Sequence, residues 1–478
     1  AGYVTDTGDL QHYHVFVLPK LFATSLGMTS EISCFKAYDV RGRIPSELNQ
    51  EIAFKIGAGV ASHFSTKSVV VGYDVRPSSL DILDALARGI ASHDSEVISI
   101  GLCGTEEIYF ATNHLNTDAG VMITASHNPA DYNGLKIVGS GAMPVSIDSG
   151  LGDIKSIAES VEYNANIKPD IKNADVRDSY LDEILSFIDV GNIKPMRIVV
   201  NSGNGCAGPV VDALESRLPI SFIKIQNEPD GSFPNGIPNP LLTENREVTS
   251  QAVIEHKADL GIAWDGDFDR CFFFDASGSF IENYYLIGLL SEELLRSNPG
   301  DHIVHDPRLV WNTREEVLKA RGTPVLSKAG HSFIKEAMRA NKAVYGGEMS
   351  GHHYFRDFYY SDSGMIPWLL LLQNISNSGQ SLSQLVDDRI QRYPVSGEIN
   401  TKVEEPRALL ERIKGHYLPQ QPIIDDLDGY SFEFSDWRFN LRMSNTEPLV
   451  RLNVESRGDE KLMNDKTEEI LDLIKNLS

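Results

Sequence analysis

The sequence predicts an α/β protein of several domains that ends in a smaller α+β domain. At about 150 residues per domain, the 478 residues correspond to about three domains. Over most of the chain, short apolar runs alternate with segments of helical spacing, which is typical of βαβ units whose helices cover a sheet. The last part of the chain changes to polar and aromatic strands. We therefore expect three related α/β units followed by one α+β domain.

The first two units are expected at residues 28–169 and 170–279. In the first, strands and helices alternate in the order 68–72, 80–92, 97–100, 106–114 and 120–123. In the second, a strand, a helix and two further strands are predicted at 197–200, 209–218, 222–225 and 260–264. The similar order of elements suggests duplication of one unit.

The third unit is expected at residues 280–391 and the α+β domain at 392–478. The third unit shows the same alternation, at 302–304, 313–320, 323–326 and 332–340. The last domain has three predicted strands and a final amphipathic helix, at 430–434, 437–443, 449–454 and 461–477. Residues 1–27 differ from the rest of the chain. They lack the basic N-terminal region of a secretory signal and therefore fit such a signal poorly. We expect them to be a leader or an added segment outside the fold.

Composition excludes several classes of protein. The net charge is 43 minus 67, or −24, whereas a duplex-binding surface needs a basic face, so no nucleic-acid partner is expected. The longest apolar stretch, residues 365–372, contains a proline and is far short of the ~20 residues that span a bilayer. The four cysteines form no CxxC pair, which fits a reducing cytoplasm. The same negative charge means that a phosphate ligand would need locally concentrated cations.

A first polar motif, residues 124–129, follows the predicted strand at 120–123. Its Ser126 places a hydroxyl on a turn beyond the end of a strand, where α/β sheets position reactive groups. An ordinary turn is the alternative, because Ser, Asn and Pro are turn formers, and this motif alone leaves both open. His127 is a tempting base, but neighbours in an extended segment point to opposite sides, so this pairing is not implied.

The second motif contains three carboxylates at alternate positions, Asp265, Asp267 and Asp269, directly after a predicted strand. Such hard oxygen ligands suit Mg²⁺ or Ca²⁺. An EF-hand is excluded, because its sixth and twelfth positions would be Arg270 and Ala276. A solvated acidic turn remains the alternative, although the apolar flanks make three unpaired carboxylates costly without a counter-ion. Arg270 also suits a phosphate oxygen.

Two further loops are rich in polar groups. Glu348 and Ser350 lie between glycines and offer oxygen atoms that suit sugar hydroxyls. Glu348 with His352 and His353 would instead suit zinc, but adjacent histidines chelate one ion poorly, so the hydroxyl interpretation is favoured.

The last loop is a phosphate cradle in composition. Within ten residues it offers hydroxyls, an amide and two guanidiniums, from Arg442, Ser444, Asn445, Thr446 and Arg451. A β-turn flanked by surface arginines is an equally open alternative. Taken together, the four motifs supply a nucleophilic hydroxyl, a metal site, a polyol site and an anion site, once each in successive units.

In order and spacing, these motifs closely resemble those of the α-D-phosphohexomutases, in particular the bacterial phosphomannomutase branch. The resemblance runs from about residue 34 to the C-terminus and includes, besides the four loops, residues 36–42, 204–205, 233–234, 238–240 and 328–331. It implies four domains around a central cleft and an enzyme that moves a phosphoryl group within a hexose phosphate.

The resemblance also implies roles near Ser126. Ser126 would carry a phosphoryl group, and Mg²⁺ would be held by a phosphoserine oxygen and by Asp265, Asp267 and Asp269. A hexose 1,6-bisphosphate would be the intermediate and activator. Arg270 would neutralise charge in the transition state. Arg41 and Lys136 would add positive charge near Ser126, and Lys136 would be the general acid and base, with a pKa lowered by burial and nearby cations.

On the substrate side, the resemblance implies that Tyr38 and His331 line the sugar cleft and that His331 assists catalysis. Glu348, Ser350 and His352 would contact the sugar. The non-reacting phosphate would be gripped by Arg442, Ser444, Asn445, Thr446 and Arg451. The segment that often carries a lysine in the family has Arg308 here, which would substitute for it.

The implied reaction is interconversion of mannose 6-phosphate and mannose 1-phosphate, with glucose phosphates as further substrates, because Met349 between Glu348 and Ser350 resembles the phosphomannomutases. The implied role is supply of mannose 1-phosphate for GDP-mannose and polysaccharide synthesis in the cytoplasm, by a monomer or dimer. A phosphoglucomutase is one alternative. A metal-dependent sugar phosphatase is another, although it would not need the second phosphate grip.

Overall fold

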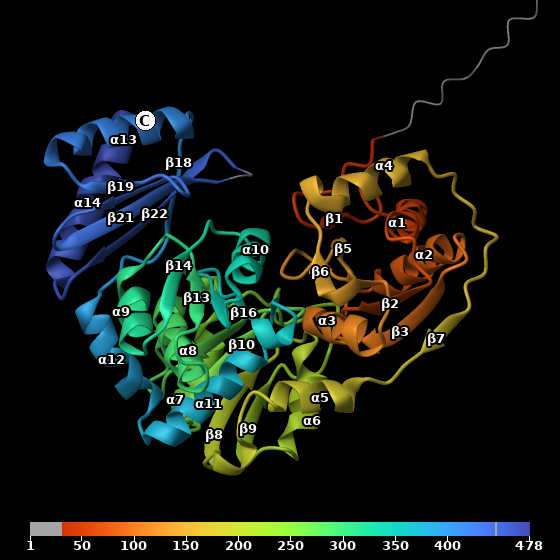
Figure 1. Ribbon diagram of the computed structural model, residues 1–478. Coiled ribbons are helices and arrows are strands. Elements are labelled where there is room, and N and C mark those ends of the chain that lie inside the picture. The colour runs from red at the N-terminus through yellow and green to blue at the C-terminus, as the bar shows by residue number, and fades with distance from the viewer. Residues whose placement is uncertain (1–30, 445–446) are drawn as a thin grey trace, which may run out of the picture. The chain divides into compact units, whose positions relative to one another are not determined.

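The computed structural model describes residues 31–444 and 447–478, and Ile32–Ser478 forms one compact unit (Figure 1). The expected leader at 1–27 lies outside the described residues. The described chain contains four β-sheets, which follow one another along the sequence. This arrangement confirms the predicted class of three α/β units and a C-terminal α+β domain.

The first sheet has seven strands in the order β1-β5-β4-β2-β3-β7, with β6 paired to β5. Its strands are β1 (Val40–Arg43), β2 (Ser68–Tyr73), β3 (Glu96–Leu102), β4 (Ala119–Ile123), β5 (Tyr132–Gly139), β6 (Met143–Pro144) and β7 (Ile171–Asn173). Its helices are α1 (Gln50–His63), α2 (Ser79–Ala91), α3 (Thr105–His114) and α4 (Gly152–Ser160). The first unit therefore reaches past the predicted boundary at 169, because the short polar strand β7 pairs in parallel with β3.

The second sheet has the order β12-β11-β10-β8-β9. Its strands are β8 (Met196–Asn201), β9 (Ile220–Ile225), β10 (Leu260–Trp264), β11 (Cys271–Phe274) and β12 (Phe280–Ile281), and its helices are α5 (Arg177–Leu185), α6 (Ala207–Glu215) and α7 (Glu247–Glu255). The third sheet has the order β14-β13-β15-β16-β17. Its strands are β13 (His302–His305), β14 (Thr323–Leu326), β15 (Tyr345–Gly347), β16 (His353–Phe355) and β17 (Ser361–Asp362).

The helices of the third unit are α8 (Asn283–Ser297), α9 (Trp311–Lys319), α10 (His331–Asn341), α11 (Ile366–Ser378) and α12 (Leu382–Arg392). The apolar stretch at 365–372 forms most of the first turns of α11, and Trp368 in it is fully buried in the core shared by the first three units. Among residues 31–444 and 447–478, no helix has both the length and the apolar character needed to cross a bilayer.

The first three sheets share one topology. Each contains three parallel strands, in the spatial order β4-β2-β3, β10-β8-β9 or β15-β13-β14. The middle strand of the three (β2, β8 or β13) is the one that comes first in the sequence. In each, the strand at one side then turns back into an antiparallel partner, β5, β11 or β16. The repeat suggested by the sequence is therefore a repeat of strand order and direction.

Three of the four polar motifs occupy the same place in this topology. The Ser126 motif connects β4 to β5, the aspartate motif connects β10 to β11, and the Glu348 motif connects β15 to β16. Each motif thus follows the carboxyl end of the parallel strand (β4, β10 or β15) that borders the antiparallel partner, and the carboxyl ends of strands are where α/β sheets bind ligands.

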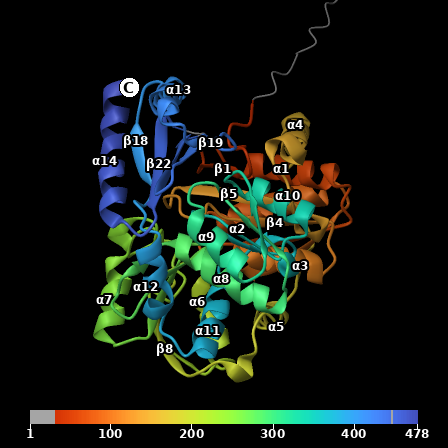
Figure 2. The same cartoon turned by 60° about the vertical axis from the view of Figure 1, so that its left-hand side comes forward.

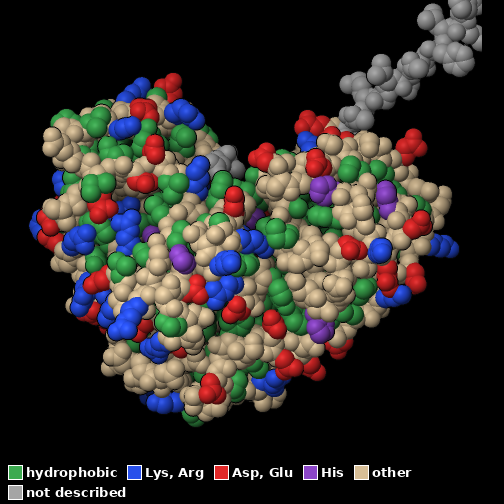
Figure 3. Space-filling model, in the orientation of Figure 1, with side chains coloured by type: hydrophobic (Ala, Val, Ile, Leu, Met, Phe, Trp, Pro, Cys, Tyr) green, Lys and Arg blue, Asp and Glu red, His purple; other side chains and the backbone are tan. Residues whose placement is uncertain are grey.

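The fourth domain is an antiparallel sheet with the order β18-β22-β21-β20-β19. Its strands are β18 (Ile399–Lys402), β19 (Ile423–Asp425), β20 (Tyr430–Glu433), β21 (Trp437–Met443) and β22 (Leu449–Ser456). Helices α13 (Pro406–Tyr417) and α14 (Glu460–Leu477) contact each other and the sheet, and they enclose a separate apolar core (Figure 2). The face seen in Figure 3 has acidic and basic side chains interspersed rather than a basic surface.

Candidate active site

The serine loop, residues 124–129, is held in a strained shape by a buried arginine. Ser126 is 4% exposed and has φ 51°, a left-handed conformation that non-glycine residues seldom adopt without support. The Arg76 guanidinium donates to the carbonyls of Ser126 (3.2 Å), Asn128 (2.6 Å), Pro129 (2.6 Å) and Tyr132 (2.9 Å). Four carbonyls on one rigid fork fix the path of the loop.

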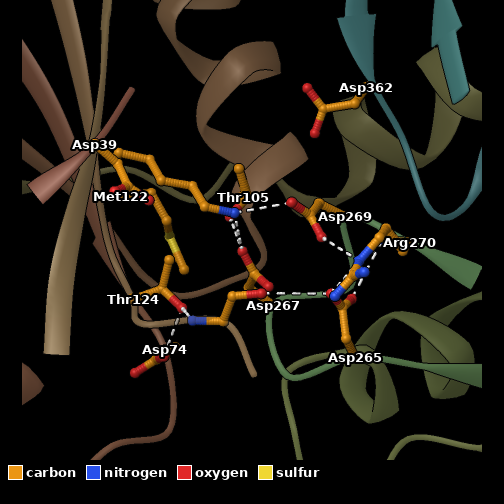
Figure 4. A network of polar contacts seen from close by, with 12 residues as sticks. Asp39, Asp74, Thr105, Met122, Thr124, Asp265, Asp267, Asp269, Arg270 and Asp362 are labelled. Carbon is orange, nitrogen blue, oxygen red and sulfur yellow. Dashed lines mark hydrogen bonds and ion pairs between the residues drawn. The ribbon is translucent and has the colours of Figure 1, made fainter. Parts of the chain in front are cut away.

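Asp74 completes this support. Its carboxylate accepts from Arg76 Nε at 3.2 Å. It also accepts from the Thr124 hydroxyl at 2.7 Å (Figure 4), and that hydroxyl accepts from the Ser126 N–H at 2.9 Å. Sequence reasoning missed both Asp74 and Arg76. The available signal was a charged pair directly after the buried strand β2, at the same edge of the sheet as the serine loop.

The aspartate loop, residues 265–270, gathers three buried carboxylates. Asp265 and Asp267 are fully buried and Asp269 is 4% exposed, and one oxygen of each lies within 4.8 Å of the others. Lys136 Nζ contacts Asp267 at 2.6 Å and Asp269 at 2.8 Å, while Arg270 Nε contacts Asp265 at 2.9 Å (Figure 4). The predicted convergence of these side chains is therefore present.

The donor set fits a divalent cation. Oδ1 of Asp267 and Oδ1 of Asp269 are buried and have no hydrogen-bond partner among the described residues. Burial and the neighbouring Asp269 raise the pKa of Asp265 well above its usual range. Burial alone would raise the pKa of Asp269 too, but Lys136 and His352 lower it well below its usual range. Hard oxygen atoms that crowd and repel one another in this way are the ligands Mg²⁺ prefers.

The serine and aspartate loops meet. Ser126 Oγ lies 3.4 Å from Asp265 Oδ2 and 3.3 Å from His127 Nδ1, which in turn lies 3.1 Å from an Arg270 nitrogen. The expectation that Ser126 and His127 point to opposite sides is wrong, because the backbone at Ser126 is left-handed rather than extended. Burial, with the charges of Arg270 and Arg41, lowers the pKa of His127 to about 2, so its imidazole is neutral.

The expected lowering of the Lys136 pKa is corrected by the structure. Burial does lower it, but the carboxylates of Asp267 and Asp269 outweigh burial and raise the pKa overall. The nearest partners of Lys136 are anions rather than the expected cations, because they come from a loop 131 and 133 residues away in sequence. Lys136 is therefore an ammonium in this arrangement.

A cavity of about 460 Å³ opens beside these loops. Its lining brings together predicted residues of all three α/β units, namely Tyr38, Arg41, Ser126, Lys136, Asp269, Arg270, His331 and His352. It also includes Tyr109, Lys335 and Asp362, which sequence reasoning missed. The rings of Tyr38 and His331 meet edge to face at 4.6 Å across it. Burial, with the charge of Lys335, lowers the pKa of His331 to about 3.

The sugar loop, residues 348–352, lies against the aspartate loop. Arg270 donates to the Ser350 carbonyl at 3.3 Å, and His352 Nε2 lies 3.6 Å from Asp269. Glu348 is 2% exposed, and its two oxygens accept from the Gly330 N–H and the Tyr354 hydroxyl, each at 2.5 Å.

The zinc alternative is excluded by the position of His353. Its ring nitrogens contact the Tyr345 hydroxyl and the Asn283 side chain inside the third unit, so it does not join His352 and Glu348 around one ion.

Arg308 and the phosphate loop, residues 442–451, form a separate group outside this cavity lining. Arg308 is buried and binds Asp306 at 2.8 Å and Glu398 at 3.3 Å, and Glu398 also binds Arg451 at 2.9 Å. Arg308 thus connects the third unit to the fourth domain, which leaves less of its guanidinium for the predicted substrate contact.

The phosphate loop itself is only partly covered. The side chain of Arg442 is 15% exposed, contacts Asp428 at 3.8 Å, and has an Nε with no partner in the described part of the chain. Burial, with the charge of Arg308, lowers the pKa of Arg442. Ser444 lies on this loop, half-buried, while Asn445 and Thr446 lie outside the described residues.

Comparison with known families decides what this chain is. Four family models match it in succession: phosphoglucomutase/phosphomannomutase alpha/beta/alpha domains I (residues 33–165), II (178–278) and III (282–393), and the C-terminal domain (398–473). The chain belongs to the phosphoglucomutase/phosphomannomutase family. It is therefore an enzyme of the mutase class.

Relatives of this family match over nearly their whole length. A phosphomannomutase of Salmonella montevideo is 55% identical over 453 residues, covering 93% of this chain and 99% of that protein. A protein of Xanthomonas campestris named as phosphohexose mutases is 54% identical over 446 residues, with the same coverage. Among solved structures, a family protein of Burkholderia thailandensis has a TM-score of 0.82 at 28% identity, covering 93% of this chain and 97% of that one.

Proposed function

We propose that this enzyme is a phosphomannomutase that interconverts mannose 6-phosphate and mannose 1-phosphate and also acts on glucose phosphates. One observation carries the proposal. The buried hydroxyl of Ser126, in the first unit, lies 3.4 Å from the Asp265 carboxylate in the aspartate loop of the second unit. Lys136 and Arg270 form ion pairs with the carboxylates of that loop. The name phosphomannomutase on relatives 50–55% identical to this chain supports mannose as the preferred sugar.

Ser126 is the proposed phosphoryl carrier. The bond between phosphorus and Ser126 Oγ breaks as a bond forms to the free hydroxyl of the hexose phosphate, which gives a hexose 1,6-bisphosphate. Lys136, an ammonium here, returns a proton to Ser126 and accepts the hydroxyl proton in turn. After the bisphosphate reorients, the reverse transfer leaves the other isomer. Arg270 and Arg41 neutralise charge on the phosphoryl oxygens during both transfers.

Asp265, Asp267 and Asp269 are the proposed Mg²⁺ ligands, with an oxygen of phosphorylated Ser126. When bound, Mg²⁺ would neutralise the phosphoryl oxygens as negative charge develops on them. Oδ1 of Asp267 and Oδ1 of Asp269 accept no hydrogen bond in the part of the chain that the structure describes, which supports this assignment; Arg270 Nε lies 3.8 Å from Asp269 Oδ1. Lys136 contacts the other oxygen, Oδ2, of both side chains.

The remaining predicted residues are proposed to bind the substrate. Tyr38 and His331 line the sugar cavity, and His331, whose imidazole is neutral, assists by hydrogen bonding. Ser350, His352 and Glu348 would contact hydroxyls, with Glu348 using lone pairs that its two present donors leave free. Arg442, Ser444, Asn445, Thr446 and Arg451 would grip the non-reacting phosphate, and Arg308 would reach the substrate only alongside its carboxylate partners.

Three measurements test the proposal. Intact mass of the purified chain should reveal one phosphate, which is lost in Ser126→Ala. A coupled assay with trace bisphosphate should give a higher kcat/KM for mannose 1-phosphate than for glucose 1-phosphate, by ~5–150-fold for a selectivity of ~1–3 kcal/mol. A large preference for glucose 1-phosphate would make it a phosphoglucomutase, and release of inorganic phosphate without isomerisation would make it a phosphatase. The proposed role is supply of mannose 1-phosphate for GDP-mannose in the cytoplasm.

A further inference from the structure

Thr105 is the first residue of helix α3 in the first unit, yet its hydroxyl and its N–H both donate to the aspartate loop of the second unit. Its hydroxyl donates to Oδ2 of Asp267 at 2.5 Å, and its N–H donates to the Asp267 carbonyl at 3.1 Å (Figure 4). Both residues are fully buried. Close approach is possible because Gly104 precedes it: a Cβ on Gly104 would lie 2.2 Å from the Phe268 ring.

These contacts leave the two carboxylate oxygens of Asp267 in different surroundings. Oδ2 receives both the Thr105 hydroxyl and the Lys136 ammonium, the latter at 2.6 Å, whereas the buried Oδ1 has no partner among residues 31–444 and 447–478. Asp269 is similar: Lys136 contacts its Oδ2, while its Oδ1 accepts no hydrogen bond among the described residues and lies 3.8 Å from Arg270 Nε. An unmet buried acceptor is costly, which points to a cation as its missing partner.

We propose that Thr105 is a positioning residue for the divalent cation, because its hydroxyl fixes the rotation of the Asp267 carboxylate and so keeps Oδ1 free as a ligand. Lys136 alone does not fix that rotation, since its ammonium sits on a flexible stem and is shared with Asp269. Thr105 is β-branched, so its χ1 is restricted, and its own N–H anchors it to the same residue. Outer partners of metal ligands act in this way in other sites. The inference rests on the proposed function, since it takes the three aspartates as the metal ligands.

Direct metal binding tests this inference without turnover. Free Mn²⁺ is measured by electron paramagnetic resonance during titration of the purified full-length enzyme. Thr105→Val, which keeps the shape and removes the donor, should raise the Mn²⁺ Kd ~10-fold or more, while Thr105→Ser, which keeps the donor, should stay within ~3-fold of wild type. Thr112→Val is the matched control, because Thr112 is buried on the same helix but donates only to the Ile108 carbonyl.

Asp267→Asn separates failure of this inference from failure of the proposed function. If Asp267→Asn loses Mn²⁺ binding but Thr105→Val binds like wild type, Thr105 has no positioning role and the aspartate site stands. If wild type and Asp267→Asn bind Mn²⁺ equally, the aspartates are not the metal site and both proposals fall. Should thermal melting find Thr105→Val unfolded, Thr105→Ala takes its place, and wild-type affinity in that variant overturns the inference.

Discussion

The serine and aspartate loops are built differently from the phosphate loop, although all three are proposed to bind parts of a phosphorylated sugar. Ser126 is 4% exposed, and Asp265 and Asp267 are fully buried. The Ser126 carbonyl accepts from Arg76 and the Asp267 carboxylate accepts from Thr105, which are both distant in sequence, while Asp265 binds Arg270 of its own loop. On the phosphate loop, the side chains of Arg442 and Arg451 are 15% and 27% exposed.

This difference matches two kinds of work. Groups that stabilise a transition state act best when their positions are set before the substrate arrives. In the proposed reaction, groups that grip the non-reacting phosphate would have to accept it in both orientations of the bisphosphate, so fewer fixed partners suit them. The difference in burial therefore fits the proposed roles, which are chemistry for the Ser126 side and recognition for the Arg442 side.

The largest expected effect that tests this comparison is at Ser126. Ser126→Ala should lower kcat ~10³-fold or more, because Ser126 is the proposed carrier of the transferred phosphoryl. The melting temperature should change little, since a single hydroxyl contributes little packing. Steady-state assay and differential scanning calorimetry measure both. Ser350→Ala, in the equivalent turn of the third unit, is the control and should lose much less kcat. Equal losses of kcat would remove the distinction between the serine loop and the sugar loop.

The next effect concerns the support beneath Ser126. Arg76→Lys keeps the charge but cannot reach four carbonyls at once, so the loop should shift and kcat should fall ~10–100-fold with KM nearly unchanged. Each carbonyl left unpaired should cost ~1–3 kcal/mol of stability unless water replaces the donor. Arg43→Lys, which alters an exposed guanidinium on the Tyr132 hydroxyl, is the control. A rise in KM at constant kcat would instead assign Arg76 to binding.

On the recognition side, Arg451→Ala should show the opposite split between the two constants. Loss of one charge-assisted hydrogen bond is worth ~1.5–3 kcal/mol, so KM should rise ~10–100-fold while kcat falls much less. Initial rates over a wide range of mannose 1-phosphate concentration measure this. Arg407→Ala, an exposed arginine of the same domain, should behave like wild type. A fall in kcat with unchanged KM would place Arg451 with the chemical groups.

The smallest effect is on stability and arises at Glu106, the neighbour of Thr105. Glu106 accepts from the Gly364 N–H at 2.7 Å and from the Tyr180 hydroxyl, which joins α3 to the third unit. Burial raises its pKa from 4.5 to about 8. The folded state therefore holds this proton more tightly than the unfolded state, so the stability contributed by Glu106 is complete below pH 4.5 and is lost as pH rises through about 8.

Glu106→Gln should remove this part of the pH dependence, because the amide cannot ionise. The melting temperature of wild type should fall more steeply between pH 5 and 9 than that of the variant, by a few degrees in total. Glu96→Gln, on an exposed ion pair with Lys172, is the control. Parallel melting profiles for wild type and Glu106→Gln would show that the Glu106 carboxyl titrates normally.

Much of the fold was predictable because it is recorded in local patterns. The strands at 260–264, 323–326 and 437–443 have the predicted bounds, and the predicted helices differ from α2, α9 and α10 by a residue or two. The antiparallel partners β5, β11 and β16 were missed. They follow the polar motifs after a short turn, and their burial on both faces removes the alternation that identifies a strand.

The types of chemical group in the candidate site were predictable from the sequence, but the contacts between their side chains were less so. Asp265, Asp267 and Asp269 converge as their spacing predicted, because one loop carries all three. The partners of Lys136 were misjudged, and Thr105, Asp74 and Arg76 were not found. A side chain's type is visible in the sequence, but its partner on another sheet is not.

By itself, the sequence determined the order of elements, the four polar loops and the type of chemistry each can perform, since these depend on residues close together in the chain. Only the tertiary structure decided that the serine, aspartate and sugar loops are equivalent turns of three equivalent sheets. It also decided that Thr105 meets Asp267 across 162 residues of sequence and that Lys136 stays charged. The physical reason is that side-chain contacts and pKa values depend on burial and on charges that folding brings close together. The distances between such groups cannot be read from patterns of nearby residues in the sequence.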